Sequence, residues 1–332
     1  MARAASSLAR APVAAVGLAL AGCTGPLSAL APAGAAADAI ATLFWWMAAG
    51  AVLIWLAFVA LAVYAVSRRS RVLSRRAGGM LIIGGGIVFP LVVLTAVLVY
   101  GLALLPRLLA PAPGNSLKIA VSGEQWWWRV RYLGPGGSPV ELANEVRLPV
   151  GEPVELSLAS PDVIHSFWIP SLAGKMDMIP GRVTRLVLEP SRTGVFRGVC
   201  AEYCGIAHAL MMFPVVVLER GEFARWLAQQ AAPAAAPVSP DARRGRALFL
   251  ASGCGACHTI RGSAARGAVG PDLTHVGSRL SLGAGILRND PDTFVRWIAR
   301  TEQVKPGVHM PAFGMLPADD LRALAAYLDS LE

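Results

Sequence analysis

Two pairs of cysteines are the first residues in this 332-residue sequence whose spacing predicts chemistry. Cys200 and Cys204 lie four positions apart, and Cys254 and Cys257 lie three positions apart. The fifth cysteine, Cys23, is isolated near the start of the chain. Paired thiols hold soft metals or attach cofactors, so each pair predicts a separate redox centre.

The first cysteine pair is accompanied by the ligands of a two-copper site. His208 and Met211 follow on the same stretch of chain, and His165 supplies a second imidazole from farther upstream. Thiolate, imidazole and thioether ligands together favour copper. Two cysteines on one loop can bridge two copper ions, each completed by one histidine. Met211 and the backbone carbonyl of Glu202 then serve as weak axial ligands.

Three other kinds of site use part of this residue set. A blue single-copper site needs only one cysteine with its two histidines. A disulfide between Cys200 and Cys204 leaves both histidines without a role, and a Cys₂His₂ zinc site leaves Met211 without one. Because the dinuclear copper site uses the whole set, it is our interpretation.

The second pair lies in Cys254-Gly-Ala-Cys257-His258, the C-x-x-C-H pattern of c-type haem attachment. The two thiols add to the haem vinyl groups, which makes the adjacent His258 an axial ligand of the iron. A thioredoxin-like redox pair is the alternative, but no βαβ pattern surrounds the motif. The sequence therefore predicts one covalent haem c.

The ligand on the opposite face of the haem has three candidates. Pro311 disfavours a helical conformation at Met310 and holds it in an extended loop. We therefore expect Met310 to bind the iron. Met315 lies closer to the start of the final helix, where it fits an apolar contact, and His309 would leave Met310 without a role. His309 and His275 are expected at the surface or at the haem edge.

The segments that must hold these two centres differ in their pattern of apolar and turn-forming residues. Short apolar segments bounded by Gly, Pro and Ser predict an all-β sandwich or barrel within residues 112–230, followed by a short helix. Residues 231–240 form an Ala/Pro linker that we expect to be semi-extended and not to pack. Residues 241–332 look helical, and the apolar residues of the last segment fall on one helix face.

Two long apolar runs lie ahead of the β-rich part. Residues 39–67 and 77–106 carry no charged side chain, and each exceeds the ~20 residues that span a bilayer as a helix. Between them lie Arg68, Arg69, Arg71, Arg75 and Arg76. A short arginine-rich loop is retained in the cytoplasm, so this part of the net charge of +9 reports membrane topology and not nucleic-acid binding.

The first 22 residues read as an export signal. Arg3 and Arg10 precede or flank an apolar stretch that ends in Leu20-Ala-Gly-Cys23, a bacterial lipoprotein box. We expect cleavage to leave Cys23 as a lipid-modified N-terminus, with an ordinary signal peptide as the alternative. The mature segment 23–111 then holds the two transmembrane helices, and both chain ends face the periplasm.

Residues 40–228 resemble subunit II of cytochrome c oxidase. The resemblance is carried by Gln125-Trp126-Trp127-Trp128, by the run from His165 to Arg182 and by the loop from Cys200 to Met211. It implies a multi-domain membrane protein with a two-helix transmembrane hairpin and an all-β cupredoxin-like Greek-key barrel that carries the CuA centre.

The C-terminal residues 241–332 resemble an all-α class I cytochrome c domain. The matching residues are Phe249, Gly270-Pro271-Asp272-Leu273 and Met310-Pro311. A haem-bearing arm on such a subunit is similar to the caa-type oxidases.

The oxidase resemblance implies roles for three further residues. Trp126 is expected over the copper site as the residue through which electrons arrive, although packing in the core is the simpler role. The Glu202 carboxylate is expected to reach a Mg or Mn ion shared with subunit I. Asp177 is expected near the same interface or in a surface salt bridge. Many oxidases carry a glutamate at the mouth of a proton channel, near the position that Ile83 occupies here. Residues 77–106 of this sequence contain no acidic residue. We therefore expect the channel to take up protons without a carboxylate from this subunit.

The histidine count limits what the chain can do alone. Of its five histidines, three are already assigned, too few for an oxygen-reducing site as well. We therefore expect the electron-input subunit of a proton-translocating cytochrome c oxidase in the bacterial inner membrane. Subunits I and III would be its partners, and a periplasmic cytochrome c or a quinol–cytochrome c reductase its donor.

Other functions share parts of this pattern. A nitric oxide reductase or another haem–copper reductase can use a CuA subunit. A membrane-tethered periplasmic electron carrier, which is not part of an enzyme, is a further alternative. A nitrous oxide reductase would need a histidine-rich propeller, and a quinol oxidase subunit lacks the copper ligands. The interface residues Glu202 and Asp177 favour the oxidase over the simple carrier.

Overall fold

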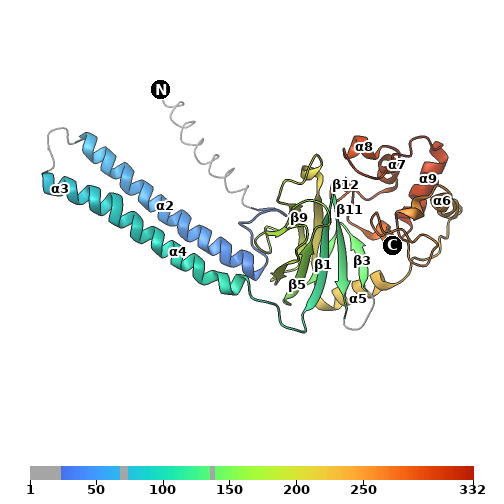
Figure 1. Ribbon diagram of the computed structural model, residues 1–332, viewed down its shortest axis with the longest axis horizontal. Coiled ribbons are helices and arrows are strands. Elements are labelled where there is room, and N and C mark those ends of the chain that lie inside the picture. The colour runs from blue at the N-terminus through green and yellow to red at the C-terminus, as the bar shows by residue number, and fades with distance from the viewer. Residues whose placement is uncertain (1–23, 68–73, 135–138) are drawn as a thin grey trace, which may run out of the picture. The chain divides into compact units, whose positions relative to one another are not determined.

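The computed structural model describes residues 24–67, 74–134 and 139–332 (Figure 1). The predicted signal peptide, Cys23 and the loop residues Arg68, Arg69 and Arg71 lie outside the described residues. The chain divides into a helical unit, Asp38–Ala110, and a second unit that contains Pro111–Glu332 and the residues before Asp38.

The helical unit contains the two predicted membrane spans. The first is α2, Ala35–Ser67, and the second runs through α3, Arg75–Met80, the π-helical η1, Leu81–Val88, and α4, Phe89–Leu108. Both are long and apolar enough to cross a membrane. Their large apolar side chains are exposed, as expected of helices whose surroundings are lipid. Ser74 caps the second span by accepting a hydrogen bond from the Ala77 amide.

Ten strands form the β-rich domain that follows. They are β1 (Leu117–Glu124), β2 (Trp127–Leu133), β3 (Val140–Ala143), β4 (Val146–Pro149), β5 (Val154–Ala159), β6 (His165–Trp168), β7 (Met176–Met178), β8 (Thr184–Leu188), β9 (Gly194–Cys200) and β10 (Met212–Leu218). One five-stranded sheet has the order β3-β2-β1-β5-β8 and the other the order β4-β10-β9-β6-β7. Among the described strands of this domain, only the β1–β5 and β4–β10 pairs are parallel. Helix α5, Arg220–Ala231, closes the domain, and the predicted β-rich fold is confirmed.

An aromatic cluster fills the centre of this domain. Trp128, Phe167 and Phe213 are fully buried, and the rings of Phe167 and Phe213 stack with centroids 4.8 Å apart. Trp128 meets both rings edge-on. Gly198 lies against this cluster, where an added Cβ would be only 2.0 Å from the Phe213 ring. The cluster therefore fixes the strands β6, β9 and β10, whose ends carry the candidate copper ligands.

The C-terminal domain is mainly helical. Its elements are α6 (Pro240–Ala251), η3 (Cys254–Ala256), η4 (Val276–Ser278), β11 (Ser281–Leu282), β12 (Leu287–Arg288), α7 (Pro291–Ala299), α8 (Thr301–Val304) and α9 (Ala318–Asp329). Helices α6 and α9 cross closely at Gly245, where a Cβ would lie 1.9 Å from the Ala323 carbonyl oxygen. Ser239 and Asp290 cap α6 and α7 through their side chains. The predicted all-α cytochrome-like part is confirmed, apart from the short β11–β12 pair.

The structure departs from two details that we expected of this region. The Ala/Pro linker does pack in its first half, where the Ala234 amide donates to the Arg261 carbonyl and Ala234 contacts the core. His275 is buried and not at the surface, with its ring nitrogens 2.7 and 3.0 Å from the carbonyl oxygens of Glu332 and Ala232. The two departures have one cause. The Ala232 carbonyl at the start of the linker needs a hydrogen-bond donor, and the buried His275 ring faces it.

Candidate functional sites

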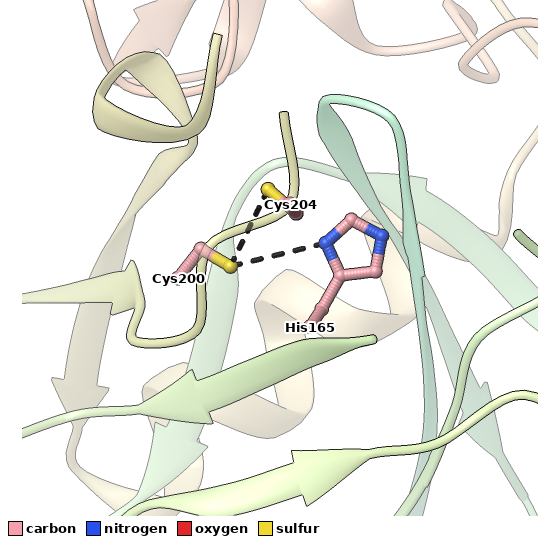
Figure 2. Close-up of side chains that lie close together, drawn as sticks. All are labelled: His165, Cys200 and Cys204. Carbon is pink, nitrogen blue, oxygen red and sulfur yellow. Dashed lines mark hydrogen bonds between the residues drawn. The ribbon is translucent and has the colours of Figure 1, made fainter. Parts of the chain in front are cut away.

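The candidate copper ligands come from the ends of three neighbouring strands. His165 begins β6, Cys200 ends β9, and Met211 immediately precedes β10. Pairing of Phe167 with Cys200 holds β6 beside β9, and the Cys200 amide donates to the Met211 carbonyl at 3.0 Å. Figure 2 shows the Cys200 sulfur joined by dashed lines to the Cys204 sulfur and to the His165 ring.

The ligand atoms of this group lie close enough to share metal ions. Those of His165, Cys200 and Cys204 all lie within 4.8 Å of one another. The two sulfurs are 3.8 Å apart, well beyond the roughly 2.05 Å of a disulfide. The described cysteines are all free. The structure thus brings the thiols together without bonding them.

The remaining predicted donors complete the group on both sides. His208 Nδ1 lies 3.5 Å from the Cys204 sulfur, and the Met211 sulfur lies 3.9 Å from it. The Glu202 carbonyl oxygen is 3.2 Å from the Cys200 sulfur. Each thiol therefore has one imidazole and one weaker donor beside it, which is the donor set that suits two soft metal ions.

The charges of this group are set by its close contacts. The hydrogen bond shared with Cys204 lowers the pKa of Cys200 to about 3, and it raises the pKa of Cys204. The two thiols therefore share a proton that metal binding must displace. Asp162 Oδ1 lies 2.8 Å from His165 Nε2, which leaves Nδ1 facing the Cys200 sulfur at 3.8 Å.

The C-x-x-C-H motif opens onto a largely apolar cavity of about 280 Å³. Cys254, Cys257 and His258 line one side, and Phe249 and Leu324 contribute to its walls. His258 Nδ1 lies 2.8 Å from the Pro271 carbonyl oxygen, so the other ring nitrogen is left free. A flat apolar cofactor joined to the two thiols fits this donor set and lining.

The two candidate methionines occupy different environments. Met310 lines the cavity, and the buried Thr301 hydroxyl donates to the Met310 carbonyl oxygen at 3.0 Å. Met315 is 77% exposed and does not line the cavity. His309 is exposed at the cavity edge. Among the three candidates, only Met310 both lines the cavity and has its backbone carbonyl fixed by the Thr301 hydroxyl.

Trp126 lies against the candidate copper loop. Its indole Nε1 and the Gln125 side-chain amide both donate to the Cys204 carbonyl oxygen, at 2.9 and 2.7 Å. Gly205 allows this approach, since a Cβ there would lie 2.9 Å from the indole. Gln125, Trp126 and Trp127 also line the cavity of the C-terminal domain. One tryptophan therefore contacts both candidate sites.

The predicted acidic residues of the interface lie at the surface. Lys175 Nζ is 2.7 Å from an Asp177 carboxylate oxygen and 3.8 Å from a Glu202 carboxylate oxygen. The hydrogen bond from Lys175 lowers the pKa of Asp177. The surface salt bridge that we weighed for Asp177 is thus present, and Glu202 directs its carboxylate outward while its carbonyl faces the thiols.

Sequence reasoning missed several residues of these sites. Asp162 orients His165, Thr301 holds the Met310 backbone, and Arg279 lines the cavity while donating to the Asp272 carbonyl oxygen. Burial lowers the pKa of Arg279. The Lys305 ammonium group is also buried between the two sites. Only Asp162, three residues before His165, carried a sequence signal.

The fold and the two sites define a class before any relative is considered. A chain with two apolar spans, a β-domain with a thiol–imidazole cluster and a C-x-x-C-H domain has the parts expected of a membrane-anchored electron-transfer protein. Residues 133–219 match the family "Cytochrome C oxidase subunit II, periplasmic domain", and residues 242–332 match "Cytochrome c". By these matches the β-domain belongs to the cytochrome c oxidase subunit II family, and the C-terminal domain belongs to the cytochrome c family.

Curated relatives agree with both matches. Cytochrome c oxidase subunit 2 of Alkalihalophilus pseudofirmus is 39% identical over 218 residues, which are 66% of this chain and 62% of that protein. The subunit 2 of Bacillus sp. strain PS3 is 35% identical over 229 residues, 66% of this chain and 63% of that protein. The chain thus spans a little under two thirds of the length of these relatives.

A solved structure covers part of the chain. The periplasmic domain of subunit II of cytochrome oxidase from Bradyrhizobium japonicum is 32% identical, with a TM-score of 0.34. The match covers 36% of this chain and 97% of that one. The two matched families imply copper and haem c as cofactors.

Proposed function

We propose that this chain is the subunit through which electrons enter a respiratory cytochrome c oxidase. Residues 241–332 would hold the haem c that takes electrons from a periplasmic donor, and residues 112–230 would hold the dinuclear copper centre that passes them to the oxygen-reducing subunit I. The observation that carries the proposal is the convergence of two thiols, two imidazoles, a thioether and a carbonyl at the ends of β6, β9 and β10. No other metal site needs that whole set.

The copper ligands have divided roles. Cys200 and Cys204 would hold the two copper ions as shared thiolate ligands, and His165 and His208, each beside one thiol, would supply one imidazole apiece. Met211 and the Glu202 carbonyl lie beside opposite thiols, as two weak axial ligands should. Asp162 keeps the His165 ring oriented, so the ligand sphere changes little when an electron arrives or leaves.

The haem ligands are held by the C-terminal domain. Cys254 and Cys257 would hold the haem covalently, and His258 and Met310 would supply the ligands of its iron. Arg279, which lines the cavity, would offer a positive charge for a haem propionate. Each cofactor, when bound, stores and releases one electron at a time. The apolar walls exclude water around it.

The partner surface and topology follow from the same assignment. The exposed carboxylate of Glu202, with Asp177 beside it, is placed to reach a Mg or Mn ion shared with subunit I. Subunit III and a periplasmic cytochrome c, or a quinol–cytochrome c reductase, complete the set of partners. Cys23 is the proposed lipid anchor, and both metal-binding domains lie on the periplasmic side of the bacterial inner membrane.

The copper centre can be tested by one substitution in the full-length chain. Cys204→Ser removes one bridge, so copper should fall below two ions per haem and the mixed-valence EPR signal of a shared unpaired electron should disappear. The haem spectrum should be unchanged, because residues 241–332 hold that cofactor. A wild-type chain with one copper ion and a blue-copper spectrum would contradict the proposal.

A further inference from the structure

Lys305 is the most deeply buried cation of the C-terminal domain. Its side chain is only 2% exposed, and its ammonium group donates to three backbone carbonyl oxygens. These belong to Trp126 at 2.6 Å, Leu210 at 2.8 Å and Gly283 at 2.9 Å. Within the described part of the chain, Lys305 forms no ion pair. An ammonium group has three N–H donors, so these three acceptors match its full capacity.

This arrangement must offset the cost of burying a charge. Burial lowers the pKa of Lys305 to about 7. Carbonyl oxygens are the partners that reduce such a cost in the absence of a carboxylate, and three of them surround the Nζ atom. Because Lys305 is buried without an ion pair, we infer that its hydrogen bonds hold the three carbonyl-bearing segments in one fixed arrangement.

Two of the three acceptors belong to the copper-binding domain. One acceptor is the backbone carbonyl of Trp126, whose indole donates a hydrogen bond to the Cys204 carbonyl. The other is the carbonyl of Leu210, the residue directly before the candidate ligand Met211. The third acceptor, Gly283, belongs to the cytochrome domain itself. Lys305 therefore joins the candidate copper loop to the cytochrome domain through a single side chain.

The loop that follows Lys305 leads to the candidate haem ligand. The Lys305 amide donates to the Thr301 carbonyl, and the Thr301 hydroxyl holds the Met310 carbonyl. Gly307 lies between Lys305 and Met310 in the chain and has φ +80°. It is so close to Trp126 that an added Cβ would be 2.8 Å from the indole ring. The same short loop thus contacts Trp126 on one side and supplies Met310 on the other.

The surrounding contacts show that the two domains are docked and not merely tethered. The Met212 amide donates to the Ala284 carbonyl at 3.0 Å across the boundary. The Leu280 amide donates to the Glu145 carboxylate at 2.8 Å. Both amides are protected by partners in the other domain, so their exchange with solvent reports whether the interface is closed.

We propose that Lys305 is a positioning residue that fixes the haem-carrying loop against Trp126 and the copper loop. It sets the distance and the path for electron transfer between the two centres through the backbone carbonyls that it holds. This inference rests on the proposed function for its kinetic consequence, whereas the docking itself can be measured independently.

The test compares Lys305→Met with Lys118→Met in the full-length, cofactor-loaded chain. Methionine has a similar length but no donors, so two carbonyls of the copper domain lose their partner. Hydrogen exchange in peptides covering Met212 and Leu280 should become about tenfold faster. Lys118 is exposed on β1, and the same substitution there should leave exchange unchanged. The haem and copper spectra should match wild type in both variants.

The kinetic readout is reduction of copper after a pulse of electrons reaches haem c. In Lys305→Met the internal step should slow on the order of tenfold, because small displacements between reacting groups are costly. Lys305→Gln retains two donors and should give intermediate values in both measurements. It also serves as the test variant if Lys305→Met does not load its cofactors.

Two results would overturn the inference. Unchanged exchange at Met212 and Leu280 would show that Lys305 does not hold the interface. Faster exchange with an unchanged internal rate would make it a structural contact without a positioning role. A wild-type chain in which reduced haem never passes an electron to copper would instead refute the proposed function, whatever Lys305 does.

Discussion

The two redox sites of this chain are built in opposite ways. In the β-domain the thiols and His165 already lie within 4.8 Å of one another, held by strand pairing and backbone hydrogen bonds. In the cytochrome domain the candidate ligands face a cavity of about 280 Å³ that the cofactor must fill. The copper site is organised by the protein, whereas the haem site needs its cofactor to complete the core.

The largest expected effect comes from blocking haem attachment with the double substitution Cys254→Ser and Cys257→Ser. An unfilled cavity of about 280 Å³ costs up to about 7 kcal/mol at about 24 cal/mol per Å³. That is comparable with the whole stability of a small domain. Residues 241–332 should lose their exchange protection while strands β1–β10 keep theirs. If both domains retained full protection, the comparison would fail.

The next effect separates the two methionines of the cytochrome domain. Met310→Ala should abolish the weak thioether-to-iron charge-transfer band of the oxidised chain and lower the haem potential markedly. Met315→Ala is the matched control, and its 77% exposure predicts an unchanged band. Survival of the band in Met310→Ala, with its loss in Met315→Ala, would show that the wrong sulfur has been assigned.

The smallest effect tests how far the copper site is preformed. Asp162→Asn keeps the shape of the side chain but weakens the contact that orients His165. Copper affinity, measured by competition with a chelator, should fall about 10- to 100-fold while the fold and the haem spectrum persist. Asp177→Asn is the control, because Asp177 pairs with Lys175 at the surface and should not change copper affinity. An unaffected Asp162→Asn variant would mean that the strands alone orient His165.

The sequence was a good guide to the residues that the structure brings together at the two candidate sites. Cys200, Cys204, His208 and Met211 occupy one loop, and Cys254 to His258 form a contiguous motif, so their spacing carries the chemistry. The membrane helices and the β-rich and helical domains were also predicted, because hydrophobic runs and periodicity reflect them directly.

The supporting residues could not be found in this way. Lys305 lies 179 positions from Trp126 in the sequence, and only tertiary folding brings them together. Thr301 and Arg279 look like ordinary polar residues of a helical domain until the cavity is seen. The failure at the linker has the same origin, because composition predicts the stiffness of an Ala/Pro segment but not the partners that its backbone finds.

The covering of Trp126 has a further consequence for how the chain meets its donor. The indole is only 7% exposed, and the loop with Gly307 lies against it. Under the proposed function a diffusing donor would have no open face there, and would have to be recognised on the outer surface of the cytochrome domain. Fusion replaces one bimolecular encounter by an intramolecular step of high effective concentration. Donor concentration and ionic strength should then govern how fast the haem is reduced and leave the step inside the chain nearly untouched.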